Sequence, residues 1–264
     1  MLTPKLPRIS KSAIFLSDFA DHFCMMGGIE LPRRDWRESE DEVRLPTLSF
    51  HISDEYLGSA SVQASEISII ALVSRPLLNT FQEDGRMGQL LVVIPFQYTS
   101  ATPFLSPLQK MLESMVLLEA LPATRVVLRI LPLSTNGSEL AWLHLAGMLA
   151  LIDSGIPLRY LSTMVGVGLS CDKQESSHQI VLDPCSEETD AILYVEAAID
   201  SVSAECKEDH ATSILMNHQR SSIPKGIIRT IVNGPLDISH LDLCMCKAMG
   251  ALELLNNCIL QAIA

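Results

Sequence analysis

The order of the predicted strands and helices most constrains the fold of this 264-residue chain. The strand-like runs, bounded by turn residues, cover 47–53, 58–65, 68–76, 89–98, 125–133, 160–170, 178–184 and 190–199. The helical segments, with apolar residues at helical spacing, cover 106–122, 137–155 and 237–263. We expect Ser106 to cap the first helix, Gly155 to end the second, and Asp237 or Ser239 to cap the last.

This order is four strands, helix, strand, helix, three strands, loop and helix. It lacks the regular βαβ alternation of a doubly wound sheet, and it predicts an α+β fold in which helices pack a mixed sheet. We expect one domain over 31–264, preceded by an N-terminal extension over residues 1–30. Residues 203–235 are polar and interrupted by Gly and Pro, so we predict a variable loop or insertion there.

Composition limits the classes of partner. Hydrophobic residues make up 48% of the chain and charged residues 19%, which is typical of a globular protein with a sizeable core. The net charge of −12 argues against autonomous binding to nucleic acid or anionic lipid, because both need a clustered positive field. A role near RNA would therefore need a local basic patch or basic neighbours.

Cysteine and histidine patterns predict no metal site and no cofactor. The seven cysteines form no CxxC pair, and the seven histidines form no HExxH motif. The longest uncharged apolar run, Leu140–Ile152, is shorter than the roughly 20 residues that span a bilayer. No apolar signal region follows the N-terminus, so we expect a soluble intracellular protein with free thiols and no membrane partner.

A polar turn before the second helix is the first candidate site. Helix N-termini present free N–H groups and a positive dipole end, so the Gly/Ser turn Asn136–Ser138 could hold a phosphate. Glu139, at the start of the helix, carries the wrong charge for that role. The alternative is ordinary helix capping, with Ser138 as N-cap and Glu139 in the first turn.

Four motifs, in order across about residues 31–200, resemble the RNase PH family. ILPLSTNGSELAWLHLAGMLALIDSGIPLRYL resembles the family's strand, D-G-G-T-R-T-A turn and helix ending in A-L-x-D-A-G. RRDWRESEDEVR resembles its R-x-D-G-R entry, with Asp35 and Arg37 aligned and Trp36 in place of the glycine. GSASVQAS resembles its G-S-A-L-V hairpin, and VGVGLS with IVLDPCSEETDAILYV resembles its V-x-x-G and D-P-[ST]-x-x-E-E series.

The resemblance implies the RNase PH-like (ribosomal protein S5 domain 2-like) fold. Enzymes of this family cleave RNA from its 3′ end with inorganic phosphate, held by the arginine of the G-T-R turn, and use acidic residues for a divalent metal. Glu139 stands at that arginine position, which implies that Asn136, Gly137, Ser138 and Glu139 are a degenerate phosphate-site remnant. Asp183 aligns with the first aspartate, Thr189 replaces the second and Asp190 follows, which implies a degenerate metal-site remnant. A structural role for Asp183, as a strand-end turn residue before Pro184, is the alternative.

The sequence most resembles the inactive RNase PH-like subunits of the eukaryotic exosome. That implies a structural subunit of a hetero-hexameric ring with related subunits, S1/KH cap proteins, a hydrolytic exoribonuclease and RNA passing through the channel, in nucleus, nucleolus and cytoplasm. The alternative is a phosphate-dependent 3′-to-5′ exoribonuclease with a rearranged site, using Asp183 and Asp190 for metal. An arginine near Asn136–Glu139 would favour it, with Arg129 and Arg159 as candidates. An unrelated metabolic enzyme is disfavoured, because no nucleophile–base set or dinucleotide glycine motif occurs.

Overall fold

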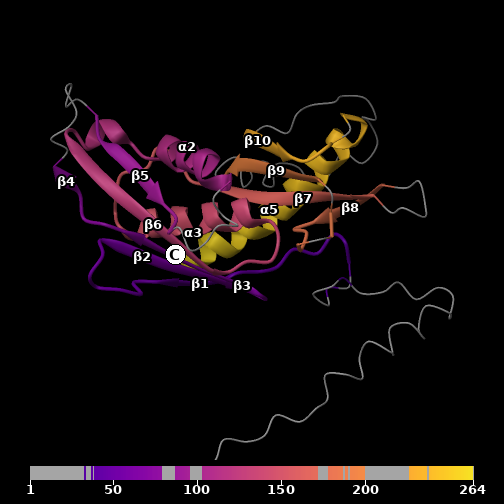
Figure 1. The fold of residues 1–264 in the computed structure, drawn as a ribbon, viewed down its shortest axis with the longest axis horizontal. Helices are drawn as coiled ribbons and strands as arrows, with labels where there is room; N and C mark the ends of the chain where they lie inside the picture. Colours follow the sequence, from indigo (N-terminus) through magenta and orange to yellow (C-terminus); the bar gives the residue numbers. More distant parts are fainter. Residues whose placement is uncertain are drawn as a thin grey trace, which may run out of the picture.

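The strands form two sheets, with helices packed on them (Figure 1). The computed structural model describes residues 33, 37, 39–78, 87–95, 103–171, 178–186, 188–189, 191–199, 226–236 and 238–263. The predicted extension over residues 1–30 lies outside these residues. The predicted α+β class is confirmed, while the division of the strands between two sheets was not foreseen.

The first sheet has six strands, with the longest at its centre. They are β1 (Thr47–Phe50), β2 (Gly58–Ala64), β3 (Ile67–Val73), β4 (Leu77–Leu78), β5 (Gln89–Val93) and β6 (Thr124–Ser134). β3 and β4 pair antiparallel with β6, and β5 pairs parallel with it, so this sheet is mixed as predicted. Alternate residues of β3 are buried, which gives the sheet one face toward the core.

The second sheet is antiparallel, in the order β10-β9-β7-β8. Its strands are β7 (Ser162–Cys171), β8 (His178–Leu182), β9 (Ala191–Ala198) and β10 (Ile227–Asn233). β10 corrects the sequence prediction, which placed these residues in the loop over 203–235. All seven of its side chains are half-buried or exposed, because it is an edge strand. Five of the seven residues are β-branched, and such residues favour a strand. Residues 203–225 lie outside the described part of the chain.

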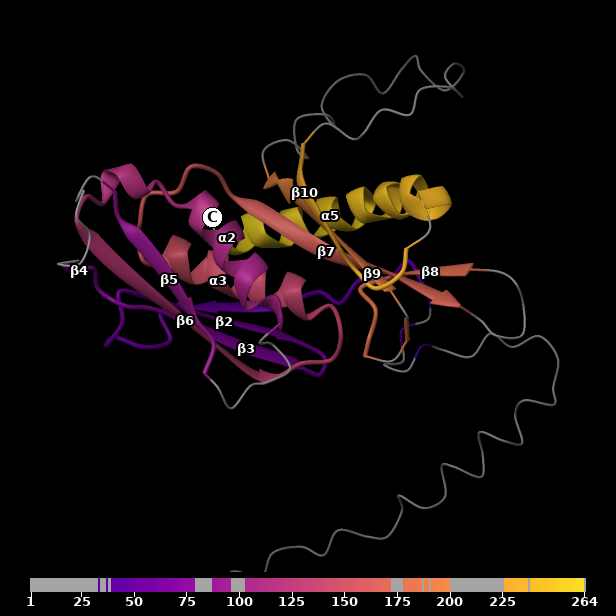
Figure 2. The same cartoon turned by 45° about the horizontal axis from the view of Figure 1, so that its top comes forward.

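Helix α3 (Glu139–Asp153) lies at the centre of the molecule (Figures 1 and 2). It packs on the inner face of the first sheet and also contacts β7 and α2 (Leu105–Met115). Twelve of its fifteen residues are buried, which explains why it is apolar all round. Gly155 follows it with φ +67°, as predicted for the residue after a helix end. The prediction for Ser106 is wrong: the N-cap of α2 is Phe104, with no side-chain cap.

Helix α5 (Leu241–Ile263) covers the second sheet and follows a short 3-10 turn, Ile238–His240. Among the described residues it is the one helix whose length and apolar character would allow it to cross a membrane. Its apolar face packs in a second core with β7, β8 and β9, as expected for a core helix of a globular protein. A further 3-10 turn, Leu118–Ala120, links α2 to β6.

Candidate functional site

The turn between β6 and α3 is held in a left-handed backbone conformation. Gly137 has φ +72° and Ser138 has φ +46°. Ser138 occupies the N-cap position of α3, as the sequence predicts, but its hydroxyl makes no capping hydrogen bond. That hydroxyl donates instead to the Pro184 carbonyl at 3.3 Å. The turn is therefore fastened to the segment after β8 rather than to its own helix.

The segment after β8 also closes one side of this turn. A Cβ added to Gly137 would lie 2.1 Å from the Pro184 carbonyl oxygen, so the two backbones are in direct contact and only glycine fits. The Ser186 N–H donates to the Asn136 side-chain oxygen at 3.0 Å, and the Asn136 amide donates to Glu66 at 2.7 Å. Protein atoms occupy the approach to the turn from this direction.

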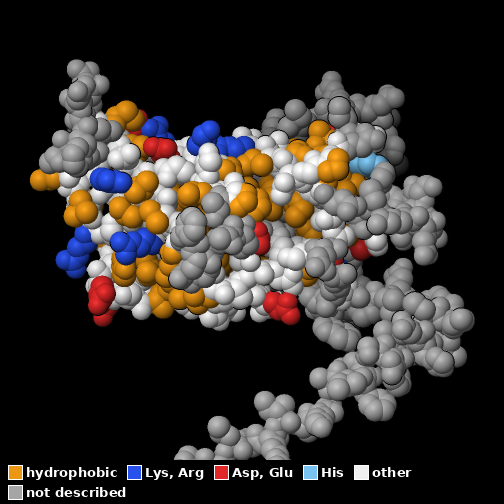
Figure 3. All heavy atoms as spheres, viewed as in Figure 1, with side chains coloured by type: hydrophobic (Ala, Val, Ile, Leu, Met, Phe, Trp, Pro, Cys, Tyr) orange, Lys and Arg blue, Asp and Glu red, His pale blue; other side chains and the backbone are white. Residues whose placement is uncertain are grey.

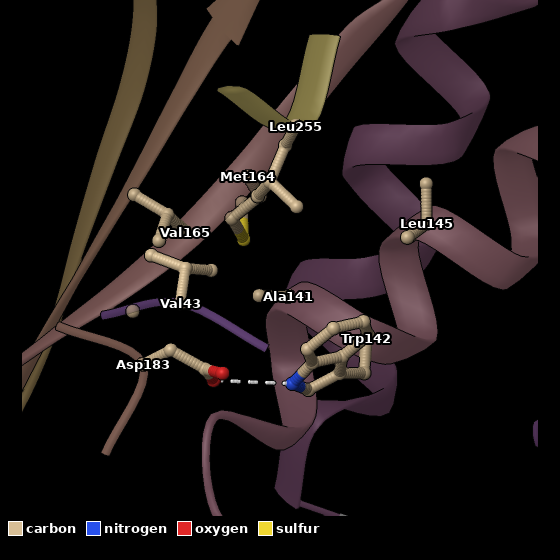
Figure 4. A pocket seen from close by; sticks show the side chains of 9 residues that line it. Val43, Ala141, Trp142, Leu145, Met164, Val165, Asp183 and Leu255 are labelled. Atoms are coloured by element: carbon tan, nitrogen blue, oxygen red, sulfur yellow. Dashed lines mark hydrogen bonds between the residues drawn. The ribbon is translucent and has the colours of Figure 1, made fainter. Parts of the chain in front are cut away.

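Asp183 lies beside the turn and is the acceptor of a buried ion pair with Arg44. The Arg44 Nε and Nη2 atoms lie 2.6 Å from the Oδ2 and Oδ1 atoms of Asp183, which makes the contact bidentate. The Arg44 backbone N–H and the Trp142 indole N–H, at 3.2 Å each, also donate to this carboxylate. Figure 4 shows the Asp183 side chain directed at Trp142. Both carboxylate oxygens thus have partners within the chain.

Arg44 also links this ion pair to the turn. Its Nη1 atom donates to the Asn136 carbonyl oxygen at 2.7 Å, and its guanidinium lies 5.6 Å from the Trp142 ring centroid. Arg44 is buried, and it is the last residue of the RRDWRESEDEVR motif. An arginine does lie at the turn, but it comes from a segment far away in sequence.

Two further arginines hold the segment after β8 in place. Arg33 donates to the Leu182 carbonyl at 2.9 Å and to Glu188 at 2.8 Å, and Arg37 donates to the Asp183 carbonyl at 2.7 Å. The Cys185 N–H donates to Glu188 at 2.7 Å. Burial raises the pKa of Glu188, but the Arg33 and Cys185 hydrogen bonds and the arginine charges outweigh it and hold that pKa below its ordinary value.

The space behind Asp183 is almost filled. The cavity there has a volume of about 10 Å³ and is bounded mainly by apolar side chains, including Val43, Met164 and Leu255 (Figure 4). A single water needs roughly 10–15 Å³ of such volume, so this cavity has room for at most one. A phosphate ion does not fit.

Glu139, the first residue of α3, is half-buried. Its carboxylate accepts a hydrogen bond from Thr135 at 3.0 Å. Burial raises the pKa of Glu139, and this hydrogen bond only partly offsets the effect. Burial and the neighbouring Glu139 charge also raise the pKa of Tyr194. Glu139 therefore adds negative charge where an anion site would need positive charge.

The structure brings most of the predicted site residues together. Asn136, Gly137 and Ser138 contact the segment that begins at Asp183, as the motif order implies. The methyl group of Thr189 lies against Gly168. A Cβ atom built on that glycine would be only 2.3 Å from the methyl carbon. Asp190, like Asp35 and Trp36, lies outside the described residues.

The sequence candidates for an arginine at the turn were wrong. Arg159 pairs with Glu119 near the end of α2, and Arg129 lies on the exposed side of β6. The sequence analysis did not identify Arg44 as a candidate, although Arg44 ends the RRDWRESEDEVR motif. Proximity along the chain was the wrong criterion, because 139 residues separate Arg44 from Asp183.

No family model matches the sequence, and no curated protein matches it significantly. Solved structures that are similar to the whole fold include the following two. A crystal structure of rice (Oryza sativa) Rrp46 matches with 18% identity and a TM-score of 0.66, over 88% of this chain and 99% of that chain. An archaeal exosome core structure matches with 17% identity and a TM-score of 0.63, over 92% of this chain and 93% of that chain. The chain therefore has the RNase PH-like fold of exosome ring subunits.

Proposed function

We propose that this chain is a non-catalytic structural subunit of an exosome-type ring, and that it supports 3′-to-5′ RNA processing and degradation without cleaving RNA itself. The fold supports the ring role. The observation that carries the non-catalytic part is the buried Arg44–Asp183 pair. Arg44 neutralises the Asp183 carboxylate, which the family resemblance assigns to a metal.

The described residues at the predicted metal site do not fit a divalent cation. A hard cation needs several oxygen ligands with free lone pairs. Asp183 has both oxygens engaged by Arg44 and Trp142, and Thr189 offers no carboxylate. No group of three or more His, Cys, Asp or Glu side chains in the described part of the chain could hold a metal.

The predicted phosphate site does not fit an anion either. The Pro184 carbonyl closes one side of the Gly137 turn, and the cavity lined by Asp183 has room for no more than one water. Glu139 adds a carboxylate nearby, and the one arginine at the turn is already paired. A carboxylate next to phosphate is repulsive, and a guanidinium whose charge is already neutralised by an aspartate attracts a second anion more weakly.

The proposed partners follow from the ring role. They are other RNase PH-like subunits in a hetero-hexameric ring, S1/KH cap proteins, a hydrolytic exoribonuclease, and RNA within the assembled channel. We place this assembly in nucleus, nucleolus and cytoplasm. The high apolar fraction, with a mean hydropathy of +0.27, supports a subunit that buries much of its surface in obligate contacts.

One experiment tests the proposed function in two arms. The tagged chain is recovered from its own cells, and RNase PH-like and S1/KH proteins should be identified with it by mass spectrometry. The purified chain is then incubated with single-stranded RNA, inorganic phosphate and Mg²⁺, and no nucleoside diphosphates should be released. A stable monomer without related subunits would refute the ring role.

The second candidate, a phosphate-dependent exoribonuclease with a rearranged site, gives the opposite result in the second arm. The presence of Arg44 at the Asn136 carbonyl is the one observation in its favour. If this candidate is correct, nucleoside diphosphates are released, and Arg44→Lys abolishes the release while its circular dichroism stays unchanged.

A further inference from the structure

The outer face of the first sheet is apolar and has no described helix packed on it. Side chains of a strand alternate between faces, and the inward ones of β3, β5 and β6 belong to the core around α3. The outward side chains of these three strands do not belong to that core. We define the outer face by Ile70, Leu72, Leu91, Arg125, Val127, Arg129 and Leu131.

The register makes this face continuous across three strands. Arg129 lies opposite Leu72 on one side and Val93 on the other, and Val127 lies opposite Leu91. Cross-strand neighbours have Cβ atoms roughly 5 Å apart, so these side chains contact one another. Figure 3 shows hydrophobic and basic side chains gathered over the β5 and β6 side of the molecule.

The face is also positively charged on an acidic protein. Arg125 and Arg129 are its charged residues, and none of the outward positions of β3, β5 and β6 carries a carboxylate. The whole chain has a net charge of −12. The Arg125 Nε atom is buried without a hydrogen-bond partner, and among the described residues no ion pair neutralises Arg129. The charge of the face is thus opposite to that of the rest of the chain.

This composition favours a protein partner. Interface cores are enriched in arginine and apolar residues and depleted of Lys, Asp and Glu. Single-stranded RNA would need aromatic side chains on which bases stack, and the outward positions of these strands hold none. A symmetric contact between two copies of this face would bring arginine against arginine.

We propose that the outer face of the first sheet is a docking surface for a different protein subunit, one that presents an apolar surface bearing carboxylates to Arg125 and Arg129. This inference rests on the proposed function, since it names a surface by which the chain joins its ring. The partner's carboxylates would neutralise the charge of the two arginines, and its apolar surface would cover the leucine and valine side chains.

A charge reversal with a matched control tests the proposal. Arg129→Glu and Lys110→Glu change the net charge equally, and both residues are exposed, but Lys110 lies on α2. The tagged full-length variants are expressed in the protein's own cells, and co-recovered RNase PH-like subunits are quantified by mass spectrometry. Recovery of one subunit should fall about tenfold or more with Arg129→Glu and stay unchanged with Lys110→Glu. Equal recovery with both variants would overturn the proposal.

A second measurement separates the failure of this surface from the failure of the ring role. A photo-crosslinking residue at position 131, in place of Leu131, should crosslink to a peptide containing Asp or Glu in one different folded protein. Arg129→Glu should abolish that crosslink. Crosslinks to a second copy, to RNA or to nothing would overturn the surface assignment. If the crosslink forms but its protein is unrelated to RNase PH, the surface assignment stands and the proposed function fails.

Discussion

Arg44 and Asp183 form a bidentate ion pair inside the protein, with both donor–acceptor distances at 2.6 Å. The pair joins the segment before β1 to the end of β8, and the Asn136 carbonyl and Trp142 indole bond to it. Because its members are almost inaccessible to solvent, each depends on the other for charge neutralisation. A buried arginine left alone would be costly, so Asp183 has a clear structural role.

Asp183→Ala should therefore destabilise the protein strongly. Removing one partner of a buried pair costs about 3–5 kcal/mol, because the other charge remains buried. The free energy of unfolding, from urea titration, measures the loss. Glu119→Ala is the control, since it removes a carboxylate from the exposed pair with Arg159 and should leave the urea midpoint nearly unchanged. Equal midpoints for the two variants would contradict this role of Asp183.

Gly137→Ala and Gly155→Ala should differ in stability although their backbone angles are alike. Both glycines have positive φ, +72° and +67°. At either position, the backbone strain of an alanine should lower the free energy of unfolding by about 1–2 kcal/mol. Only at Gly137 does the new Cβ meet backbone, 2.1 Å from the Pro184 oxygen, whereas nothing lies within 4 Å at Gly155. We expect a total loss of about 3 kcal/mol or more for Gly137→Ala, measured by thermal unfolding. Equal losses would mean that the segment after β8 does not press on the turn.

The Arg33–Glu188 pair should make the protein sensitive to acid. The pKa of Glu188 in the folded protein lies below its ordinary 4.5, so its stabilisation is present above pH 4.5 and is lost as the pH falls through the lower, folded value. Glu188→Gln should lose about 1–3 kcal/mol at pH 7 and show a shallower decline in stability below pH 4.5. Glu113→Gln, on α2, is the control for removing one carboxylate. A parallel decline in wild type and Glu188→Gln would exclude this pair as the source.

Glu139→Arg should not create a phosphate site, although Glu139 stands at the position of the family's phosphate-holding arginine. The arginine restores a cation at the helix N-terminus, but the Pro184 carbonyl closes one side of the turn, and the cavity lined by Asp183 is only about 10 Å³. Thermal unfolding in phosphate, compared with chloride at equal ionic strength, should therefore shift equally for wild type and variant. A phosphate-specific shift in Glu139→Arg would show that the turn is open to solvent.

The sequence by itself determined the fold class and the buried central helix. The apolar character of residues 140–152 requires a buried helix, and Gly155 ends it because glycine accepts positive φ. In the structure, Gly137 and Ser138 contact Pro184, the residue after Asp183. The helix and its end are local features or depend on periodicity, which a sequence displays directly.

The tertiary structure decided which charges meet and which strands pair. Arg44 reaches Asp183 across 139 residues, and no local pattern distinguishes it from Arg129 or Arg159. The sequence prediction missed β10 because it treated the polar, Gly- and Pro-containing segment 203–235 as one loop, although Ile227–Asn233 is rich in β-branched residues. The structure pairs this strand with β9. The Ser138 hydroxyl donates to the Pro184 carbonyl and not to a group of its own helix, because the fold places that carbonyl next to the turn. Such contacts depend on the positions of distant segments, and only the folded chain fixes those positions.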